Sequence, residues 1–192
     1  MTRPSIVVRA SRIVAALVAG LVVAITLSGC AARPLTWDPS SDAKVYLMNN
    51  TTTLQFADGS TVDWNTNQGV VVTSAPILAV PTDWDPMALP APANGALDYM
   101  AFIAPTGSER NKASWKLWGS AYPLDGKGAL LPSVWPGYLV HGDAKAVKDG
   151  GGTYSMGVAY LKDNDKTVVS AYYTTITIDA GKGTWKFASP SK

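Results

Sequence analysis

Alternation of apolar and polar positions is the dominant pattern of the chain, and it is clearest in residues 167–178. A period of two residues is typical of a strand that buries one of its faces. Val168, Tyr172 and Ile176 occupy even positions of this run, so an unbroken strand would place them on the same face. We therefore expect these three side chains to be buried together in the core.

Two more alternating runs, at residues 154–160 and 184–187, surround this segment. The connection at residues 162–166 is rich in Asp and Asn, whose short polar side chains hydrogen-bond nearby backbone and tolerate left-handed geometry. Residues 180–183 contain glycines that favour a second tight turn. The sequence thus predicts three consecutive antiparallel strands within residues 153–188.

Shorter apolar runs earlier in the chain predict further strands. They occur near residues 45–47, 54–56, 62–64, 70–73, 77–80, 97–103, 115–117 and 138–140. One short helix is expected at residues 143–148, with Asp143 as its N-cap. Many short strands with almost no helix favour an all-β fold, either an antiparallel β-sandwich of the immunoglobulin-like kind or a barrel.

Two long segments interrupt the strand pattern. Residues 81–95 are rich in proline, and residues 125–137 are rich in glycine and proline. Because proline cannot donate a hydrogen bond to a sheet, neither segment is expected to be a central strand. Long loops on a β scaffold are where binding residues usually lie. The alternative is that both segments are ordered crossovers whose aromatic side chains pack into the core.

The N-terminal segment has a different pattern. Arg3, Arg9 and Arg12 precede an apolar stretch at residues 13–26, and Leu27-Ser28-Gly29-Cys30 follows it. This stretch has the length of a signal-peptide apolar region and falls short of the roughly 20 apolar residues that a spanning helix needs. The last four residues resemble the lipobox of bacterial lipoproteins.

That resemblance implies cleavage between Gly29 and Cys30 and attachment of a diacylglyceryl group to the Cys30 thiol. Two or three acyl chains give stable membrane anchoring, which one chain does not. The predicted organisation is a cleaved signal peptide at residues 1–29, a lipidated cysteine with a short tether at residues 30–43, and a single β-sandwich domain at residues 44–192. The alternative is a plain secretory signal or an N-terminal membrane helix, in which Cys30 is incidental.

Removal of the predicted leader changes the size and the charge of the chain. The mature chain would have 192 − 29 = 163 residues, enough for one domain with a sizeable core. Three arginines leave with the leader, so the formal charge falls to +2 − 3 = −1. A nearly neutral domain offers no electrostatic basis for binding nucleic acid. Cys30 is the only cysteine, so its lipidation would exclude disulfides and thiolate chemistry.

Residues suited to catalysis or metal binding are sparse. His141 is the only histidine and Glu109 the only glutamate. Asp83 and Asp85 could act as a carboxylate pair only if burial raised the pKa of one of them. We therefore expect no catalytic centre, no metal site and no cofactor, with an aspartate-dependent hydrolase as the minor alternative.

Aromatic residues are abundant, with seven tryptophans and eight tyrosines. Trp115 and Trp118 are three positions apart, so on one strand they would face opposite sides. Trp84, Trp118 and Trp135 lie in loops or face away from the expected core, which makes them the candidate binding residues. The alternative is that they are outer-face aromatics covered by the long loops.

These features predict an envelope lipoprotein anchored to a bacterial membrane, with its domain exposed outside the cytoplasm and acting as a non-catalytic binding module. Its partner would be an envelope glycan or a protein. A second possibility is a structural lipoprotein, or a prophage-type exclusion factor that occupies an envelope component. A cleft lined by Trp and Asp would favour sugar binding or hydrolysis, whereas a flat aromatic patch would favour a protein partner.

Overall fold

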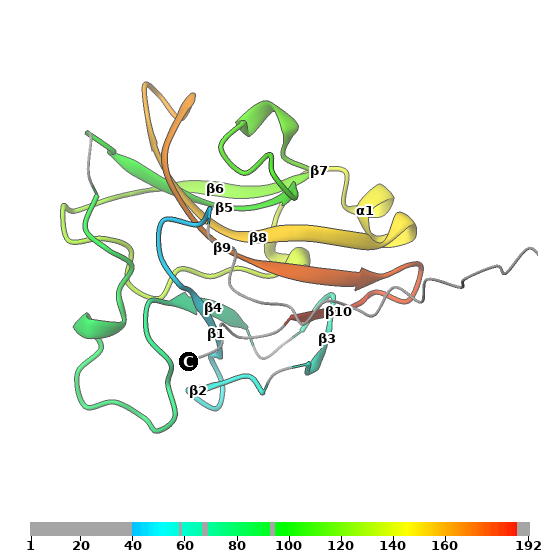
Figure 1. The fold of residues 1–192 in the computed structure, drawn as a ribbon, viewed down its shortest axis with the longest axis horizontal. Helices are drawn as coiled ribbons and strands as arrows, with labels where there is room; N and C mark the ends of the chain where they lie inside the picture. The colour runs from blue at the N-terminus through cyan, green and yellow to red at the C-terminus, as the bar shows by residue number, and fades with distance from the viewer. Residues whose placement is uncertain (1–39, 58, 67–68, 93–94, 188–192) are drawn as a thin grey trace, which may run out of the picture. The chain divides into compact units, whose positions relative to one another are not determined.

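The computed structural model describes residues 40–57, 59–66, 69–92 and 95–187, all within one compact unit. They form two antiparallel sheets, with the strand orders β2-β1-β4 and β3-β10-β9-β8-β5-β6-β7 (Figure 1). The larger sheet curls into a half-barrel. The prediction of an all-β, antiparallel sandwich or barrel is confirmed.

The elements are short except in the centre of the larger sheet. The smaller sheet consists of β1 (Tyr46–Asn49), β2 (Leu54–Gln55) and β4 (Val70–Thr73). The larger sheet consists of β3 (Thr61–Asp63), β5 (Asp98–Pro105), β6 (Leu117–Pro123), β7 (His141–Gly142), β8 (Gly152–Lys162), β9 (Thr167–Asp179) and β10 (Thr184–Phe187). The helical segments are α1 (Ala144–Gly150) and the 3-10 turns η1 (Asp85–Met87), η2 (Lys112–Ser114) and η3 (Pro136–Tyr138). No helix in the described residues combines the length and the apolar character that crossing a bilayer requires.

The strands β8, β9 and β10 form the meander that the sequence predicts for residues 153–188. β9 pairs antiparallel with β8 along nearly its whole length and with β10 near its C-terminal end. The β8–β9 turn contains Asp163, Asn164 and Asp165, all with positive φ. Aspartate and asparagine adopt this conformation more easily than other side chains, which is why the polar connection signals the turn.

The main core lies between the two sheets. Leu47 of β1 and Val72 of β4 join Val158 of β8 and Trp185 of β10 in one buried cluster. A second cluster lies on the opposite face of the larger sheet. Its buried members are Met100, Phe102, Ala104, Trp115, Ala159, Leu161, Ala171 and Tyr173. Because side chains alternate along each strand, β5, β8 and β9 are buried on both faces.

A β-bulge reverses the alternation near the start of β9. Tyr160 pairs with Ser170, whereas the next residue of β8 pairs with Val168, so β9 contains one extra residue. Tyr172 and Ile176 therefore face the main core, while Val168 packs against the second cluster. The expectation that these three side chains share one face is wrong for Val168, because the alternation is broken between them.

Two of the predicted short strands are absent at their expected positions. Residues 77–80 form an irregular segment between Pro76 and Pro81. Residues 138–140 follow a 3-10 turn that Pro136 begins, and the strand β7 forms directly after them. In both cases a proline with a fixed φ and no N–H group prevents an apolar run from joining a sheet.

The one α-helix of the described residues begins where its capping residue predicts. The Asp143 carboxylate accepts a hydrogen bond from the backbone N–H of Ala146, 2.9 Å away. The helix ends at Gly150 and is capped by Gly151, whose φ is 58° and whose Cβ, if present, would lie 2.6 Å from the backbone nitrogen of Ala180. Both the positive φ and the close approach require glycine there.

Residues 40–43 form a strap along the free edge of β9, in a part of the chain that we expected to be tether. β10 covers only residues 176–179 of that edge. The Asp42 backbone N–H donates to Ala171 O over 3.0 Å, and the Asp42 carboxylate accepts from Ala171 N over 2.7 Å. Ser41 Oγ accepts from the backbone N–H of Tyr173 over 3.0 Å. The folded domain therefore includes Ser40 and the residues that follow it.

Candidate functional site

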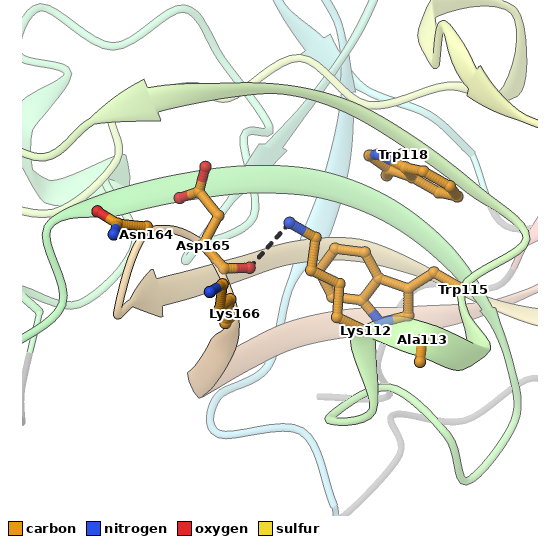
Figure 2. Close-up of a pocket in the computed structure, with 7 residues that line it drawn as sticks. All are labelled: Lys112, Ala113, Trp115, Trp118, Asn164, Asp165 and Lys166. Carbon is orange, nitrogen blue, oxygen red and sulfur yellow. Dashed lines mark hydrogen bonds between the residues drawn. The ribbon is translucent and has the colours of Figure 1, made fainter.

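A cleft of about 440 Å³ opens on the face of the larger sheet that carries the second cluster. It lies between the β5–β6 loop, the start of β6 and the β8–β9 turn (Figure 2). Its lining residues are Lys112, Ala113, Trp115, Trp118, Asn164, Asp165 and Lys166. Two indoles thus meet one carboxylate, one amide and two ammonium groups in a single cleft.

Trp115 forms a fixed wall of the cleft. Its side chain is only 5% exposed and stacks on Phe102, with ring centroids 4.7 Å apart and an angle of 13° between the rings. The indole N–H donates a hydrogen bond to the backbone carbonyl of Glu109 over 2.8 Å. Packing and hydrogen bonding together hold this ring in place without a ligand.

Trp118 is half-buried and lies beside Trp115 rather than on the other face of the sheet. The prediction that these two residues face opposite sides is wrong, because Trp115 ends the turn η2 and β6 begins only at Leu117. The Trp118 ring stacks on His141 of the adjacent strand β7, with centroids 5.8 Å apart. The imidazole ring stacks on one part of the indole ring, and the rest of the indole lines the cleft.

Glu109 supports the β5–β6 loop through hydrogen bonds, and no sequence pattern selected it as a functional residue. The side chain is 4% exposed. Its carboxylate accepts hydrogen bonds from Ser155 Oγ at 2.6 Å and from the Gly107 N–H at 2.8 Å. A buried carboxylate needs such donors to offset its lost hydration. The one available signal was its position as the only glutamate, just after the Pro105-Thr106-Gly107 turn.

The β8–β9 turn supplies the polar side of the cleft. Asp163, Asn164 and Asp165 have φ values of 57°, 54° and 62°, a conformation that strains L-residues by roughly 1 to 2 kcal/mol each and less for Asp and Asn. Lys112 Nζ donates to the backbone carbonyl of Asp165 over 2.8 Å and so joins the loop to the turn. Within the described residues, Asp165 Oδ1 is buried and has no hydrogen-bond partner.

Of the three tryptophans predicted to bind, the structure places only Trp118 in the cleft. Trp84 precedes the turn η1 and packs against a third apolar cluster beside the smaller sheet. Trp135 packs against the main core and contacts the Tyr138 ring, with centroids 4.7 Å apart. Trp115, which the strand pattern would have placed away from Trp118, lines the cleft instead.

The groups considered for catalysis are dispersed. His141 and both Asp83 and Asp85 are exposed, and Asp83 accepts a hydrogen bond from the Asp85 N–H as in an ordinary polar turn. In the part of the chain that the structure describes, no three His, Cys, Asp or Glu side chains gather where they could hold a metal ion. Cys30 and Gly29, the predicted lipidation and cleavage sites, lie outside the described residues.

Burial raises the pKa of Tyr99, Tyr138, Tyr160 and Tyr172, with the largest shifts at Tyr138 and Tyr160. It raises the pKa of Tyr138 to about 12, and a hydrogen bond of 2.8 Å to the Tyr122 hydroxyl adds to this shift. Burial also raises the pKa of Tyr160 to about 12, although the Ala129 N–H that it accepts opposes the shift. Both phenols stay protonated at neutral pH and act as hydrogen-bonding core residues.

Comparisons of the chain with protein-family models, with curated proteins and with solved structures give no match.

Proposed function

We propose that the protein is a membrane-anchored envelope lipoprotein whose β domain binds an envelope glycan in the tryptophan-lined cleft without transforming it. The observation that carries this proposal is the juxtaposition of Trp118 with Asp165 and Lys112 in one cleft. A sugar ring has an apolar C–H face and a rim of hydroxyl groups, and this cleft offers a partner to each.

The aromatic and polar groups take complementary parts in the proposed binding. An indole supplies a large, rigid apolar surface for the C–H face of a sugar at low cost in rotamer entropy. The Asp165 carboxylate can accept a hydrogen bond from a sugar hydroxyl, while Lys112 Nζ and the Asn164 amide can donate to hydroxyl oxygens. Because Lys112 is already fixed by Asp165 O and Trp115 by Glu109 O, little ordering accompanies binding.

Three alternatives fit the cleft less well. A protein partner would need a broad contact surface, whereas this site is a concave cleft of a size suited to a small ligand. A glycoside hydrolase commonly needs two carboxyl groups about 5 to 10 Å apart, and Asp165 is the only carboxylate among the lining residues. A structural or exclusion lipoprotein would have no need for a cleft that combines aromatic and polar side chains.

The binding proposal is tested with polysaccharides purified from bacterial cell walls, by calorimetry on Trp118→Ala and on Trp84→Ala as a matched control. Both residues are half-buried tryptophans, but only Trp118 lines the cleft. We expect Trp118→Ala to weaken glycan binding by more than about 1 kcal/mol while Trp84→Ala leaves it unchanged. Equal affinities for the wild type and Trp118→Ala would refute the assignment of the cleft.

The anchor has its own test. Expressed in a bacterium, the chain should co-sediment with membranes and incorporate labelled fatty acid, and Cys30→Ala should abolish the labelling. Wild-type protein that carries no lipid by mass spectrometry would reduce the N-terminal segment to an ordinary secretory signal.

A further inference from the structure

A third apolar cluster lies on the face of the smaller sheet that points away from the main core. Met48 of β1, Val71 of β4 and Ile77 are buried in it. Trp84, Met87 and Leu131 pack against them and are partly exposed. The cover over this face comes from the long segment between β4 and β5 and from the loop that contains Leu131 (Figure 1).

Three large apolar side chains that are close in sequence to members of this cluster remain in contact with solvent. Leu78 is 70% exposed and Val80 61%, and both follow Ile77 within three positions. Leu130, at 49%, directly precedes Leu131. We call Leu78, Val80, Trp84 and Leu130 the outer apolar patch. Exposed apolar side chains around one cluster, rather than scattered singly, indicate an interaction surface.

Backbone hydrogen bonds to β4 hold the segment next to Leu130 in place, although Leu131 within it has a strained conformation. Leu131 has a φ of 49°, which is unusual for a bulky side chain. The next residues are pinned to β4, since Val72 N–H donates to Pro132 O over 2.9 Å and Val134 N–H donates to Val70 O over 2.7 Å. The strained turn therefore presents Leu130 outward from a segment that is itself fixed. Strain of this kind persists where the surrounding structure enforces it, often at functional sites.

We propose that the outer apolar patch contacts the lipid bilayer to which the protein is anchored. This inference rests on the lipid anchor of the proposed function and is independent of glycan binding. The structure describes the domain from Ser40 onward, and 40 − 30 = 10 residue steps separate Ser40 from Cys30. Ten steps span at most about 33 to 36 Å, so an anchored domain stays at the membrane surface. The outer apolar patch is an exposed apolar surface of the described domain that such a bilayer could cover.

Charge and side-chain type indicate which lipid surface would suit the outer apolar patch. Residues 74–92 contain no Lys or Arg, and their only charged residues are Asp83 and Asp85, both exposed. A surface of this charge is repelled by anionic headgroups and tolerated by zwitterionic ones. Trp84 lies between the two carboxylates, and an indole prefers the boundary between headgroups and acyl chains. The proposed contact is therefore shallow, with Leu78 and Val80 entering the bilayer and both aspartates at headgroup level.

The test uses the full lipidated chain reconstituted into phosphatidylcholine vesicles in which part of the lipid is brominated near the headgroup end of its acyl chains. Bromine quenches tryptophan fluorescence only at short range. We expect part of the emission of the wild-type chain to be quenched, and Trp84→Phe to remove the quenched part. Leu78→Asp combined with Val80→Asp should abolish the quenching while the chain still floats with the vesicles.

Val140→Asp is the matched control, because Val140 is 71% exposed but lies outside the outer apolar patch. It should leave the quenching unchanged. A chain that floats with vesicles but shows no quenching overturns the contact and leaves the anchor standing. A chain that does not float overturns both. Quenching that survives Trp84→Phe unchanged would place another tryptophan at the lipid and overturn the assignment to this patch.

Discussion

Lys112 and Asp165 lie 53 positions apart in the sequence, and Lys112 Nζ donates a hydrogen bond of 2.8 Å to the backbone carbonyl of Asp165. This bond joins the loop that carries Trp115 and leads into the Trp118 strand to the turn that carries Asn164 and Asp165. The cleft thus exists because two separate connections of the larger sheet meet on one face. The position of each wall depends on the hydrogen bonds and packing that hold its connection against the sheet.

Glu109 provides that support for the β5–β6 loop. Glu109→Ala would leave Ser155 Oγ and the Gly107 N–H without their acceptor, at a cost of about 1 to 3 kcal/mol for each buried donor that finds no substitute. We expect a lower free energy of unfolding in urea and a weaker glycan affinity, because the loop that holds Trp115 loosens. Glu109→Gln keeps one acceptor oxygen and should lose less than half as much. Equal losses in the two variants would show that the charge, rather than the acceptor, matters.

The bulge in β9 places two apolar residues of the same strand on opposite faces, so we expect their substitutions to lower the stability by different amounts. Ile176 is fully buried in the main core, so Ile176→Ala should destabilise the domain by about 2 to 5 kcal/mol through the cavity it leaves. Val168 is only partly buried against the second cluster, so Val168→Ala should cost about 1 kcal/mol or less. Chemical unfolding of both variants measures the difference. Similar losses would mean that the bulge does not separate the two side chains.

The sequence predicted the parts of this fold that depend on neighbouring residues. Alternation and polar turns were sufficient for β8, β9 and β10, and a capping residue was sufficient for α1. The bulge near Val168 could not be predicted, because it depends on how β9 registers against β8. The same holds for the cleft. Trp115 joins Trp118 because η2 ends just before β6, and Asp165 joins them only through contacts between distant loops.

Tyr160 should make the domain sensitive to alkaline pH. Its pKa is raised from 10.0 to about 12 by burial, so the folded state holds the phenol proton more tightly than the unfolded state does. The stability that this contributes is complete below pH 10 and is lost as the pH rises from about 10 through 12. In an absorbance titration, Tyr160→Phe should remove one of the phenols that ionise last. If the late-ionising absorbance is unchanged in Tyr160→Phe, Tyr160 ionises at its ordinary pKa.

His141 separates a binding module from an enzyme. It is exposed and stacks on Trp118, and aromatic pairs of this kind contribute about 0.5 to 1.5 kcal/mol. His141→Ala should therefore reduce glycan affinity by about 1 kcal/mol or less, through a less ordered Trp118, and by less than Trp118→Ala does. Calorimetry gives both values, and chromatography of the incubated glycan checks for cleavage products.

If the wild type cleaves its glycan and His141→Ala slows cleavage about a hundredfold or more, as loss of a general base would, the histidine is catalytic and the cleft is an active site. Intact glycan with both proteins would instead leave Trp118 as a binding surface that His141 merely supports.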